Sequence, residues 1–490
     1  MIRASRSVSG LVLAALLAGC NMTPAYHRPA TDVPAAFKEE PGWRPARPAD
    51  DVARGEWWRL FRDPVLDDLE RRVLVSNQNL AAALAAYEQA RGVVKEQRAG
   101  LFPTVDLQAG ATRTGSFGQR DPEDDGSDDG SGSGAGGVNV GKRYQGSIGA
   151  TWEPDVWGRI RSSVSQAGAA AEASRADLAN ATLSAQGELA LNYLQLRAMD
   201  AQIALIDETI AAYDRGLEIT TNRYNVGVVG KLDVVQAETQ LRSARAEAAD
   251  LRRQRAVLEH AIAVLVGENP SSFALPAADW SPAVPEVPGI LPGDLLERRP
   301  DVAAAERRVA AANSGVGIAR AAFFPTFTIS GDVGVNSRQL SQLFASSATV
   351  WSLGAQVAET LIDWGARSAR LEQAKAAWRQ AGAEYRQAVL TAFQQTEDQF
   401  AAMRLLAEVG AERAAAETAA RRAEQITQNQ YLAGIVAYTD VISAQATAFG
   451  ARQSSISAVL ARQTAAVSLI QAIGGHWTSE PAPIPEVQRP

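Results

Sequence analysis

The chain contains the same sequence pattern twice, and this duplication limits its fold to two copies of one structural unit. Leu101-Phe102-Pro103-Thr104 recurs as Phe323-Phe324-Pro325-Thr326, and we call the displacement from Leu101 to Phe323 the first offset. Further pairs share a shorter displacement, the second offset: Trp157-Gly158 with Trp364-Gly365, Tyr224 with Tyr431, Gly227 with Gly434, Asp233-Val234 with Asp440-Val441, and Val266-Gly267 with Ile473-Gly474. The displacement changes once, between Thr104 and Trp157, and a single insertion in the acidic, glycine-rich stretch 119–141 explains the change.

Each copy is predicted to form a helix, two strands, a very long helix, a tight turn and a returning helix. The expected helices are 64–100, 159–224 and 232–266 in the first repeat (64–267), and 294–322, 366–431 and 439–473 in the second (294–474). At 1.5 Å per residue, each long helix would reach roughly 100 Å. A seven-residue repeat in the first long helix predicts a coiled-coil seam. Its rows are Leu189, Leu196, Ile203, Ile210, Leu217 and Tyr224, and Met199, Ile206 and Tyr213.

Four segments alternate between apolar and polar residues, as Val105 and Leu107 alternate with Asp106 and Gln108. They are predicted as strands at about 104–113, 143–153, 326–336 and 349–358. Each is about 10 residues long, which is enough to cross a membrane as a tilted strand. Aromatic residues near the strand ends suit a membrane interface: Trp152, Trp157, Trp351 and Trp364. Because four strands cannot close a barrel and an open edge is forbidden in hydrocarbon, several chains must pool their strands. Three chains would give twelve strands and twelve helical columns, although the number three does not follow from this argument.

The N-terminus has the features of a processing signal. Residues 1–19 are predicted as a signal peptide, because Arg3 and Arg6 precede an apolar stretch too short to span a bilayer. Leu17-Ala18-Gly19-Cys20 matches the lipobox of bacterial lipoproteins, which predicts a covalent lipid on Cys20, the only cysteine in the chain. Asn21 stands where inner-membrane retention favours aspartate, which indicates the outer membrane.

Several functional classes are disfavoured by what the sequence lacks. Loss of the signal changes the formal net charge from −7 to −9, and without a basic patch nucleic acid is not expected as a partner. There is no nucleophile elbow, phosphate loop or metalloprotease motif, so no enzyme is predicted. His27, His260 and His476 are far apart, which argues against a metal site. The acidic stretch 119–141 lacks EF-hand spacing, which favours a solvated loop over a calcium site. No cofactor is expected besides the lipid.

The two turns between long and returning helices carry a family resemblance. Arg223-Tyr-Asn-Val-Gly-Val-Val-Gly-Lys-Leu-Asp-Val-Val-Gln-Ala and Gln430-Tyr-Leu-Ala-Gly-Ile-Val-Ala-Tyr-Thr-Asp-Val-Ile-Ser-Ala, with the duplication and the lipobox, resemble outer-membrane factors of the TolC/OprM type. The resemblance covers essentially the whole mature chain. It is strongest to the lipidated, NodT-like branch that serves resistance-nodulation-division efflux systems.

The resemblance implies a mainly α fold with a membrane β-barrel, assembled as a homotrimer with a twelve-stranded barrel on a twelve-helix coiled-coil tunnel. It implies a passive channel in the outer membrane of a Gram-negative bacterium, which exports drugs or other toxic compounds. An inner-membrane pump and a periplasmic adaptor protein would be its partners. The stretches 119–141 and 337–347 would be extracellular loops. Residues 20–63, 268–293 and 475–490 would form a belt around the tunnel.

Site residues follow from the resemblance by position. Asp233, Tyr431 and Asp440 match the periplasmic gate of the family. The turn residues Gly227, Val228, Gly434 and Ile435 match the tip at which the adaptor docks. This chain departs from the family pattern at Val436 and Ser443, where a basic and an acidic residue are usual. A gate here would therefore rely less on ion pairs, and a ring of Asp440 carboxylates would favour cations.

Other interpretations stay open at this stage. Asp233 and Asp440 are equally suited to cap the helices that follow each turn, and Tyr431 to packing between helices. The exit duct of a type I protein-secretion system is the alternative function, which the lipobox disfavours. A trimeric adhesin or periplasmic scaffold is disfavoured because strands recur at the matching place in both repeats. Only Met22, Met199 and Met403 remain in the mature chain, which weakly disfavours a copper or silver path.

Overall fold

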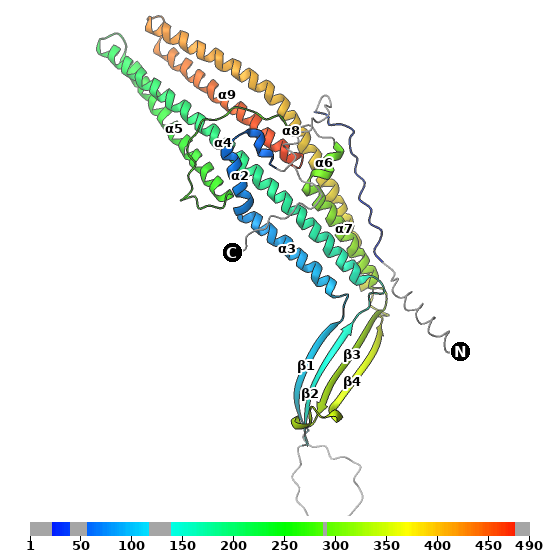
Figure 1. The fold of residues 1–490 in the computed structure, drawn as a ribbon. Coiled ribbons are helices and arrows are strands. Elements are labelled where there is room, and N and C mark those ends of the chain that lie inside the picture. The colour runs from blue at the N-terminus through cyan, green and yellow to red at the C-terminus, as the bar shows by residue number, and fades with distance from the viewer. Residues whose placement is uncertain (1–21, 40–55, 117–138, 288–291, 476–490) are drawn as a thin grey trace, which may run out of the picture. The chain divides into compact units, whose positions relative to one another are not determined.

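The structure is a computed structural model that describes residues 22–39, 56–116, 139–287 and 292–475. In the described chain, both copies of the repeat form the same succession of elements (Figure 1). The first copy consists of α2 (Pro64–Ser76), α3 (Gln78–Ala99), β1 (Thr104–Ser116), β2 (Asn139–Trp152), α4 (Arg159–Asn225) and α5 (Lys231–Leu265). The second consists of α6 (Pro292–Arg298), α7 (Pro300–Ala321), β3 (Thr326–Ser337), β4 (Thr349–Ala358), α8 (Ala366–Leu432) and α9 (Tyr438–Ala472). Short 3-10 helices lie at η1 (Trp57–Phe61), η2 (Leu340–Gln342) and η3 (Ser346–Ala348).

The long helices and the returning helices have the same lengths in the two copies. The long helices α4 and α8 contain 67 residues each, and the returning helices α5 and α9 contain 35 each. Each long helix continues one residue past the position expected from the sequence. Left-handed glycines recur in register with the duplication, at Gly158 and Gly365, Gly227 and Gly434, and Gly267 and Gly474. In the part of the chain that the structure describes, no helix has a stretch apolar enough to traverse a bilayer.

The heptad rows of α4 pack as a seam against the returning helix. Ile206 and Tyr213 are buried in a cluster with four residues of α5: Leu241, Ala244, Ala248 and Leu251. Ile203, Ile210 and Leu217 of the other row are partly buried against this cluster. The predicted coiled-coil seam is therefore observed, and its partner is the helix that follows the turn. Tyr224, the last residue of the row, is 40% exposed, so the seam ends before the turn.

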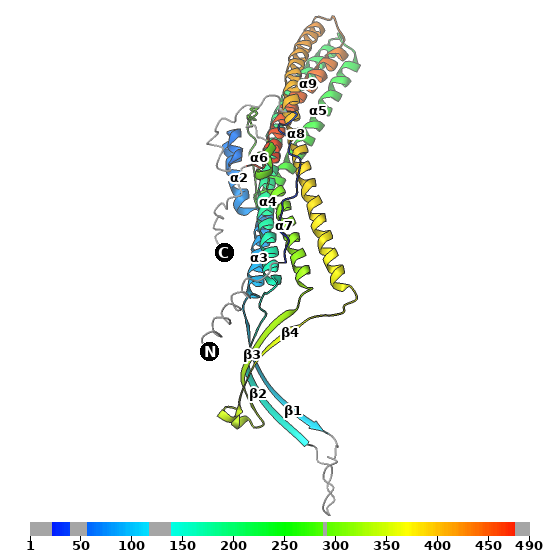
Figure 2. The ribbon, with the colours of Figure 1, turned by 90° about the vertical axis from the view of Figure 1, so that its right-hand side faces the viewer.

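The four strands form one antiparallel sheet in the order β1-β2-β3-β4 (Figure 1, Figure 2). In the first hairpin Thr104 faces Thr151, and in the second hairpin Thr326 faces Ala358. The first offset leads from Thr104 to Thr326, and the second offset leads from Thr151 to Ala358. The two hairpins therefore have the same register, and β2 and β3 join them with Ile148 facing Val333.

The alternation of side chains gives this sheet one apolar and one polar face. One row across all four strands consists of Leu107, Ile148, Val333 and Trp351. All four of these side chains are exposed. The adjacent row, which points to the opposite face, consists of Asp106, Gly149, Asp332 and Ser352. Successive residues of a strand point to opposite faces, so these two rows define the character of each face. The apolar face of a single chain is open to its surroundings.

The expected first helix of each copy is in fact two helices, which corrects the predictions of 64–100 and 294–322. The first copy breaks at Asn77, whose backbone is extended and whose side chain accepts from the N–H groups of Asn79 and Leu80. The second breaks at Arg299, because Pro300 follows and disfavours a helical conformation before it. The first offset converts Asn77 into Arg299, so both breaks belong to the duplication.

Both breaks also cap the end of a returning helix. The side-chain amide of Asn77 donates to the carbonyl of Leu265, at 2.8 Å. In the second copy the guanidinium of Arg299 donates to the carbonyl of Ala472, also at 2.8 Å. Leu265 and Ala472 are related by the second offset, so each copy satisfies the same orphan carbonyl with a different side chain.

The chain divides into two compact units, and each contains residues of both copies. Of the described residues, one unit comprises 22–27, 90–116, 139–171 and 308–381 and includes the sheet. The other unit comprises the described residues 28–39, 56–89, 172–287, 292–307 and 382–475. The main core of this second unit packs η1 and α2 against α4, α5 and α9. Its largest fully buried members include Trp57, Trp58, Leu66, Leu69, Leu189, Tyr193, Leu196 and Ile262.

Candidate functional site

Both turns between long and returning helices have the same backbone geometry. In the first turn the N–H of Val228 donates to Arg223 O and that of Gly227 to Tyr224 O, both at 2.9 Å. In the second turn Ile435 and Gly434 make the equivalent bonds to Gln430 and Tyr431. This is the Schellman arrangement, which needs a left-handed residue that glycine adopts without strain. Gly227 has φ +78° and Gly434 φ +76°. The glycines predicted from the sequence thus form the two turns.

The turns carry exposed apolar side chains, which is unusual for solvent-facing loops. Val228 is 61% and Ile435 71% exposed. Val226, Leu232 and Leu432 beside them are exposed as well. We call these five residues the tip patch. Exposed apolar groups gathered in one place are typical of a surface that contacts another protein.

A cluster of aromatic residues lies behind the turns and joins the two helical hairpins. Tyr431 and Tyr438 are buried with ring centroids 5.3 Å apart. Arg223 of α4 places its guanidinium 4.6 Å from the centre of the Tyr431 ring and donates to the Tyr431 carbonyl at 3.4 Å. Burial raises the pKa of Tyr438, whose hydroxyl is hydrogen-bonded to Thr220 of α4. Tyr431 therefore packs between helices, the alternative that the sequence left open, and it does so where the hairpins meet.

The two predicted gate aspartates lie at the start of the returning helices. Asp440 accepts a hydrogen bond from the backbone N–H of Ala437 at 3.1 Å, and its side chain is exposed. It therefore caps α9 while one face of its carboxylate stays open to solvent. Asp233 is in the first turn of α5 and is half-buried. Capping and an exposed charge are thus compatible at Asp440.

An ion pair that the sequence analysis missed links the hairpins farther from the turns. Arg452 of α9 donates to the carboxylate of Glu208 of α4 at 2.7 Å, and this bond lowers the pKa of Glu208. Burial raises the pKa of the neighbouring Glu424 of α8. These side chains line a polar groove between the two hairpins. Because Glu208 and Arg452 are 244 residues apart and do not occupy matching positions in the two copies, no sequence signal could have paired them.

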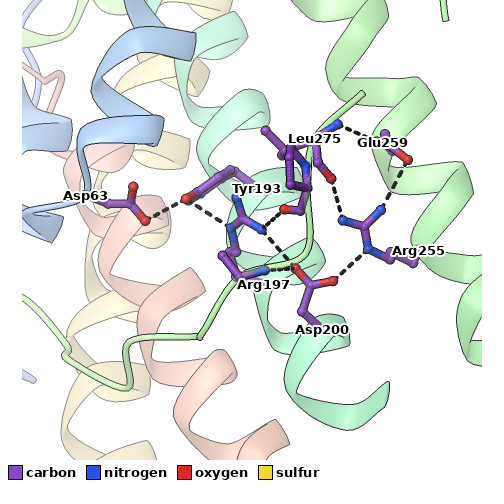
Figure 3. A network of polar contacts seen from close by, with 9 residues as sticks. Asp63, Tyr193, Arg197, Asp200, Arg255, Glu259 and Leu275 are labelled. Carbon is purple, nitrogen blue, oxygen red and sulfur yellow. Dashed lines mark hydrogen bonds and ion pairs between the residues drawn. The ribbon is translucent and has the colours of Figure 1, made fainter. Parts of the chain in front are cut away.

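A second network missed by sequence analysis anchors the linker after α5 (Figure 3). Asp200 of α4 accepts from Arg197 at 2.9 Å and from Arg255 of α5 at 2.6 Å. The same two arginines donate to the linker carbonyls of Pro276 and Leu275. The side chains of Arg197 and Asp200 are 5% and 4% exposed. The network therefore connects α4, α5 and the linker through charges of which the two on α4 are almost fully buried.

The network extends to the start of α2. The hydroxyl of Tyr193 donates to the carboxylate of Asp63 at 2.6 Å, and Arg197 donates to the same hydroxyl at 3.1 Å. Burial, with the carboxylate of Asp63 nearby, raises the pKa of Tyr193. Asp63 also caps α2 by accepting from the N–H groups of Val65 and Leu66. A continuous series of hydrogen bonds between largely buried side chains thus connects the start of α2 with the linker.

Some predicted sites lie outside the described residues. Cys20, the signal peptide, residues 117–138 of the acidic stretch and the tail after residue 475 belong to this group. Within the described ranges, no three His, Cys, Asp or Glu side chains come together as metal ligands.

The fold and the tip turns together define a class of protein: two copies of a long helical hairpin, each connected to a strand hairpin, with one apolar face of the sheet exposed. Residues 69–268 and 291–475 match the family model described as outer membrane efflux protein. The chain belongs to this family. The predicted family and fold class are confirmed, and with them the role of an efflux channel in the outer membrane.

Individual relatives support the same assignment. The toluene efflux pump outer membrane protein TtgC of Pseudomonas putida is 31% identical over 469 residues, which cover 95% of this chain and 94% of that protein. The solved structure of the outer-membrane channel OprN has a TM-score of 0.82 at 28% identity, covering 93% of this chain and 99% of that one. The open state of the MtrE outer membrane channel of Neisseria gonorrhoeae has a TM-score of 0.79 at 28% identity, with 93% and 98% covered.

Proposed function

We propose that the chain is the outer-membrane exit channel of a tripartite efflux system. It conducts small molecules passively from an inner-membrane pump and a periplasmic adaptor to the outside, without a catalytic site or cofactor. The observation that carries the proposal is the four-stranded sheet, whose apolar face is exposed in a single chain. An outward apolar face and an inward polar face suit a sheet that separates lipid from an aqueous channel.

The same sheet supports assembly as a homotrimer. β1 and β4 are edge strands, each with one neighbour in the described chain. An unpaired strand edge cannot be left in hydrocarbon, because each unsatisfied backbone group costs several kcal/mol there. Three copies bring twelve strands, which can close on themselves and leave no edge. The helices of three copies would continue this cylinder as a tunnel.

The cargo that we propose is small, apolar organic molecules. The relative TtgC is named for toluene efflux. The proposal extends that class of compound, and not toluene itself, to this chain. A passive duct needs no tight binding site for its cargo, so the pump would select the molecules that enter.

The tip patch is the proposed docking site of the adaptor. Its exposed apolar residues stand at the ends of both helical hairpins, where a partner could contact both turns at once. The gate would lie beside it, at Tyr431, Asp233 and Asp440. Opening would separate the hairpins, and the contact of Arg223 with Tyr431 and the ion pair of Arg452 with Glu208 would resist that separation.

A lipid on Cys20 would anchor the mature chain, and this part of the proposal has its own test. Replacement of Cys20 by serine removes the thiol that would be acylated, so metabolic labelling with palmitate should be lost. The unmodified chain, expressed in parallel, should be labelled. Labelling that persists in the Cys20→Ser variant would assign the lipid to another residue.

The test of channel function is conductance of the purified protein in a planar bilayer, measured under a KCl gradient. The wild-type channel should prefer K⁺ to Cl⁻, because three Asp440 carboxylates would surround the narrow end. Asp440→Asn removes the charge and keeps an oxygen that can accept from Ala437. The permeability ratio for K⁺ over Cl⁻ should therefore move toward one.

The matched control is Asp250→Asn, which neutralises an exposed carboxylate on α5 far from the turns. This variant should retain the wild-type permeability ratio. A preparation that never conducts would overturn the proposed channel. A conducting Asp440→Asn variant with wild-type selectivity would remove only Asp440 from the gate.

A further inference from the structure

A tryptophan secures the junction between the two strand hairpins inside one chain. Trp157, between β2 and α4, stacks on Phe324 with ring centroids 4.7 Å apart and an interplanar angle of 25°. Its indole N–H donates to the carbonyl of Pro325 at 2.8 Å. Phe324 and Pro325 directly precede β3, the strand that pairs with β2. The contact therefore joins the end of the first strand hairpin to the beginning of the second.

The counterparts of these three residues lie at the two open edges of the sheet. Within one chain they are not in contact with one another. Trp364, between β4 and α8, matches Trp157, and it is 96% exposed. Phe102, directly before β1, matches Phe324 and is 69% exposed. Pro103 matches Pro325. Figure 2 shows the connection from β4 to α8 standing apart from the other connections between strands and helices.

The backbone of Trp364 differs from that of its counterpart. Trp364 has φ +53°, one of two left-handed non-glycine residues in the described chain, and Trp157 is not among them. A bulky side chain in this region is strained by roughly 1–2 kcal/mol. Trp157 is held by a stack and a hydrogen bond. Among the described residues of its own chain, Trp364 has no such stack or hydrogen bond.

The duplication also specifies how the two edges would pair. When the first offset is added to the residues of β1 and the second to those of β2, the pairs of β1 and β2 become the pairs observed between β3 and β4. The second offset relates Ile148 of β2 to Ala355 of β4, and the first offset relates Ala111 of β1 to Val333 of β3. Because Ile148 faces Val333, the duplication predicts that Ala355 of β4 faces Ala111 of β1. In this register the apolar row of β4 continues into the apolar row of β1, so the two faces of the sheet stay distinct.

We infer that β4 of one copy pairs with β1 of the next copy in this register, and that Trp364 stacks on Phe102 of that copy and donates to the carbonyl of its Pro103. The inference rests on the proposed self-assembly and goes beyond it, because it states which residues meet. The contact between copies is then a repetition of the contact within a copy. A ring of identical junctions results, half of them within a chain and half between chains.

The register is tested by cysteine cross-linking in the full-length protein. The variant with Ala111→Cys and Ala355→Cys should form oxidised dimers and trimers on denaturing gels, because directly opposed residues have Cβ atoms about 4.5–5.5 Å apart. Two shifted pairs are controls on the same face: Ala111→Cys with Leu353→Cys, and Ala111→Cys with Val357→Cys. Their diagonal separation of about 7–8 Å is too long for an efficient disulfide.

The outcomes separate this inference from the proposed function. Cross-linking of a shifted pair in preference to Ala111 and Ala355 overturns the register while self-assembly stands. A trimer by size in detergent without cross-linking of any pair also overturns the inference. A monomer that does not conduct overturns the proposed function itself.

The contact of Trp364 with Phe102 and Pro103 of the next copy, which we call the tryptophan lock, is tested by the resistance of the oligomer to heating in detergent. Trp364→Ala should lower the dissociation temperature, and Trp364→Phe should lower it less because the stack is partly retained. Phe344→Ala is the matched control, since Phe344 is an 88% exposed aromatic residue between β3 and β4. An equal response of Trp364→Ala and Phe344→Ala would overturn the lock.

Discussion

Replacement of Asp200 by alanine is expected to lower the free energy of unfolding by about 3–5 kcal/mol, the usual cost of removing one partner from a buried ion pair. The carboxylate accepts from Arg197 and Arg255 at 2.9 and 2.6 Å, and it is 4% exposed. Alanine would leave both guanidinium groups close together in a nearly dry environment. Urea unfolding of the purified protein, followed by circular dichroism at one fixed concentration, measures the change.

A matched control lies two turns farther along the same helix. Asp207 of α4 also pairs with an arginine of α5, Arg252, at 2.7 Å, but both side chains are about half exposed. Exposed ion pairs contribute about 0–1 kcal/mol, so Asp207→Ala should change the unfolding free energy little. Equal effects of Asp200→Ala and Asp207→Ala would contradict a structural role for the buried network.

The buried network around Asp200 could not be predicted from the sequence. Asp200 and Arg255 are 55 residues apart, and the linker carbonyls that complete the network carry no side-chain signal at all. Buried charges of this kind are recognised only after the helices have been placed side by side. The linker 268–293 could be predicted from its prolines, but the contacts that hold its described part, 268–287, could not.

The overall architecture could be predicted from the sequence because regular repeats of apolar residues specify it. The seven-residue repeat of α4 predicted the seam on which Ile206 and Tyr213 are buried. The two-residue alternation predicted the strands, and the duplication predicted that the second copy would match the first. The helix breaks at Asn77 and Arg299 were missed, because a side chain that caps from within a helical pattern leaves the apolar spacing unchanged. Pro300 was the one signal that favoured the second break.

The residues predicted for the gate and the turns beside it differ in the same way, between local sequence signals and contacts of distant segments. The turn glycines were predicted correctly because a left-handed turn between long helices leaves a local signature at Gly227 and Gly434. The roles of Tyr431 and Asp440 at a gate remain predictions. Arg223, which faces Tyr431 from the other hairpin, was missed although it lies next to a matched tyrosine. Its counterpart in the second copy is Gln430, so the duplication did not mark it.

Gly267→Ala is the second substitution for which a large loss is expected, about 2–5 kcal/mol of unfolding free energy from backbone strain and overpacking together. Gly267 lies two residues after the end of α5 with φ +73°, and an added Cβ would overlap the backbone carbonyl of Ser76. The left-handed backbone alone costs roughly 1–2 kcal/mol for a residue with a side chain. The overlap adds the cost of overpacking, about 1–3 kcal/mol, and it displaces the neighbouring Asn77 from the Leu265 carbonyl that it caps.

The first tip turn provides the control for this substitution. Gly227 has nearly the same φ, +78°, but an added Cβ there would meet nothing within 4 Å. Gly227→Ala should therefore cost only the backbone strain, roughly 1–2 kcal/mol, and the difference between the two variants isolates the close approach of α5 to Ser76. Urea unfolding of both variants at the same protein concentration measures that difference. Two equal losses would mean that the end of α5 can move away from Ser76, and that the cap at Asn77 does not hold this helix end in place.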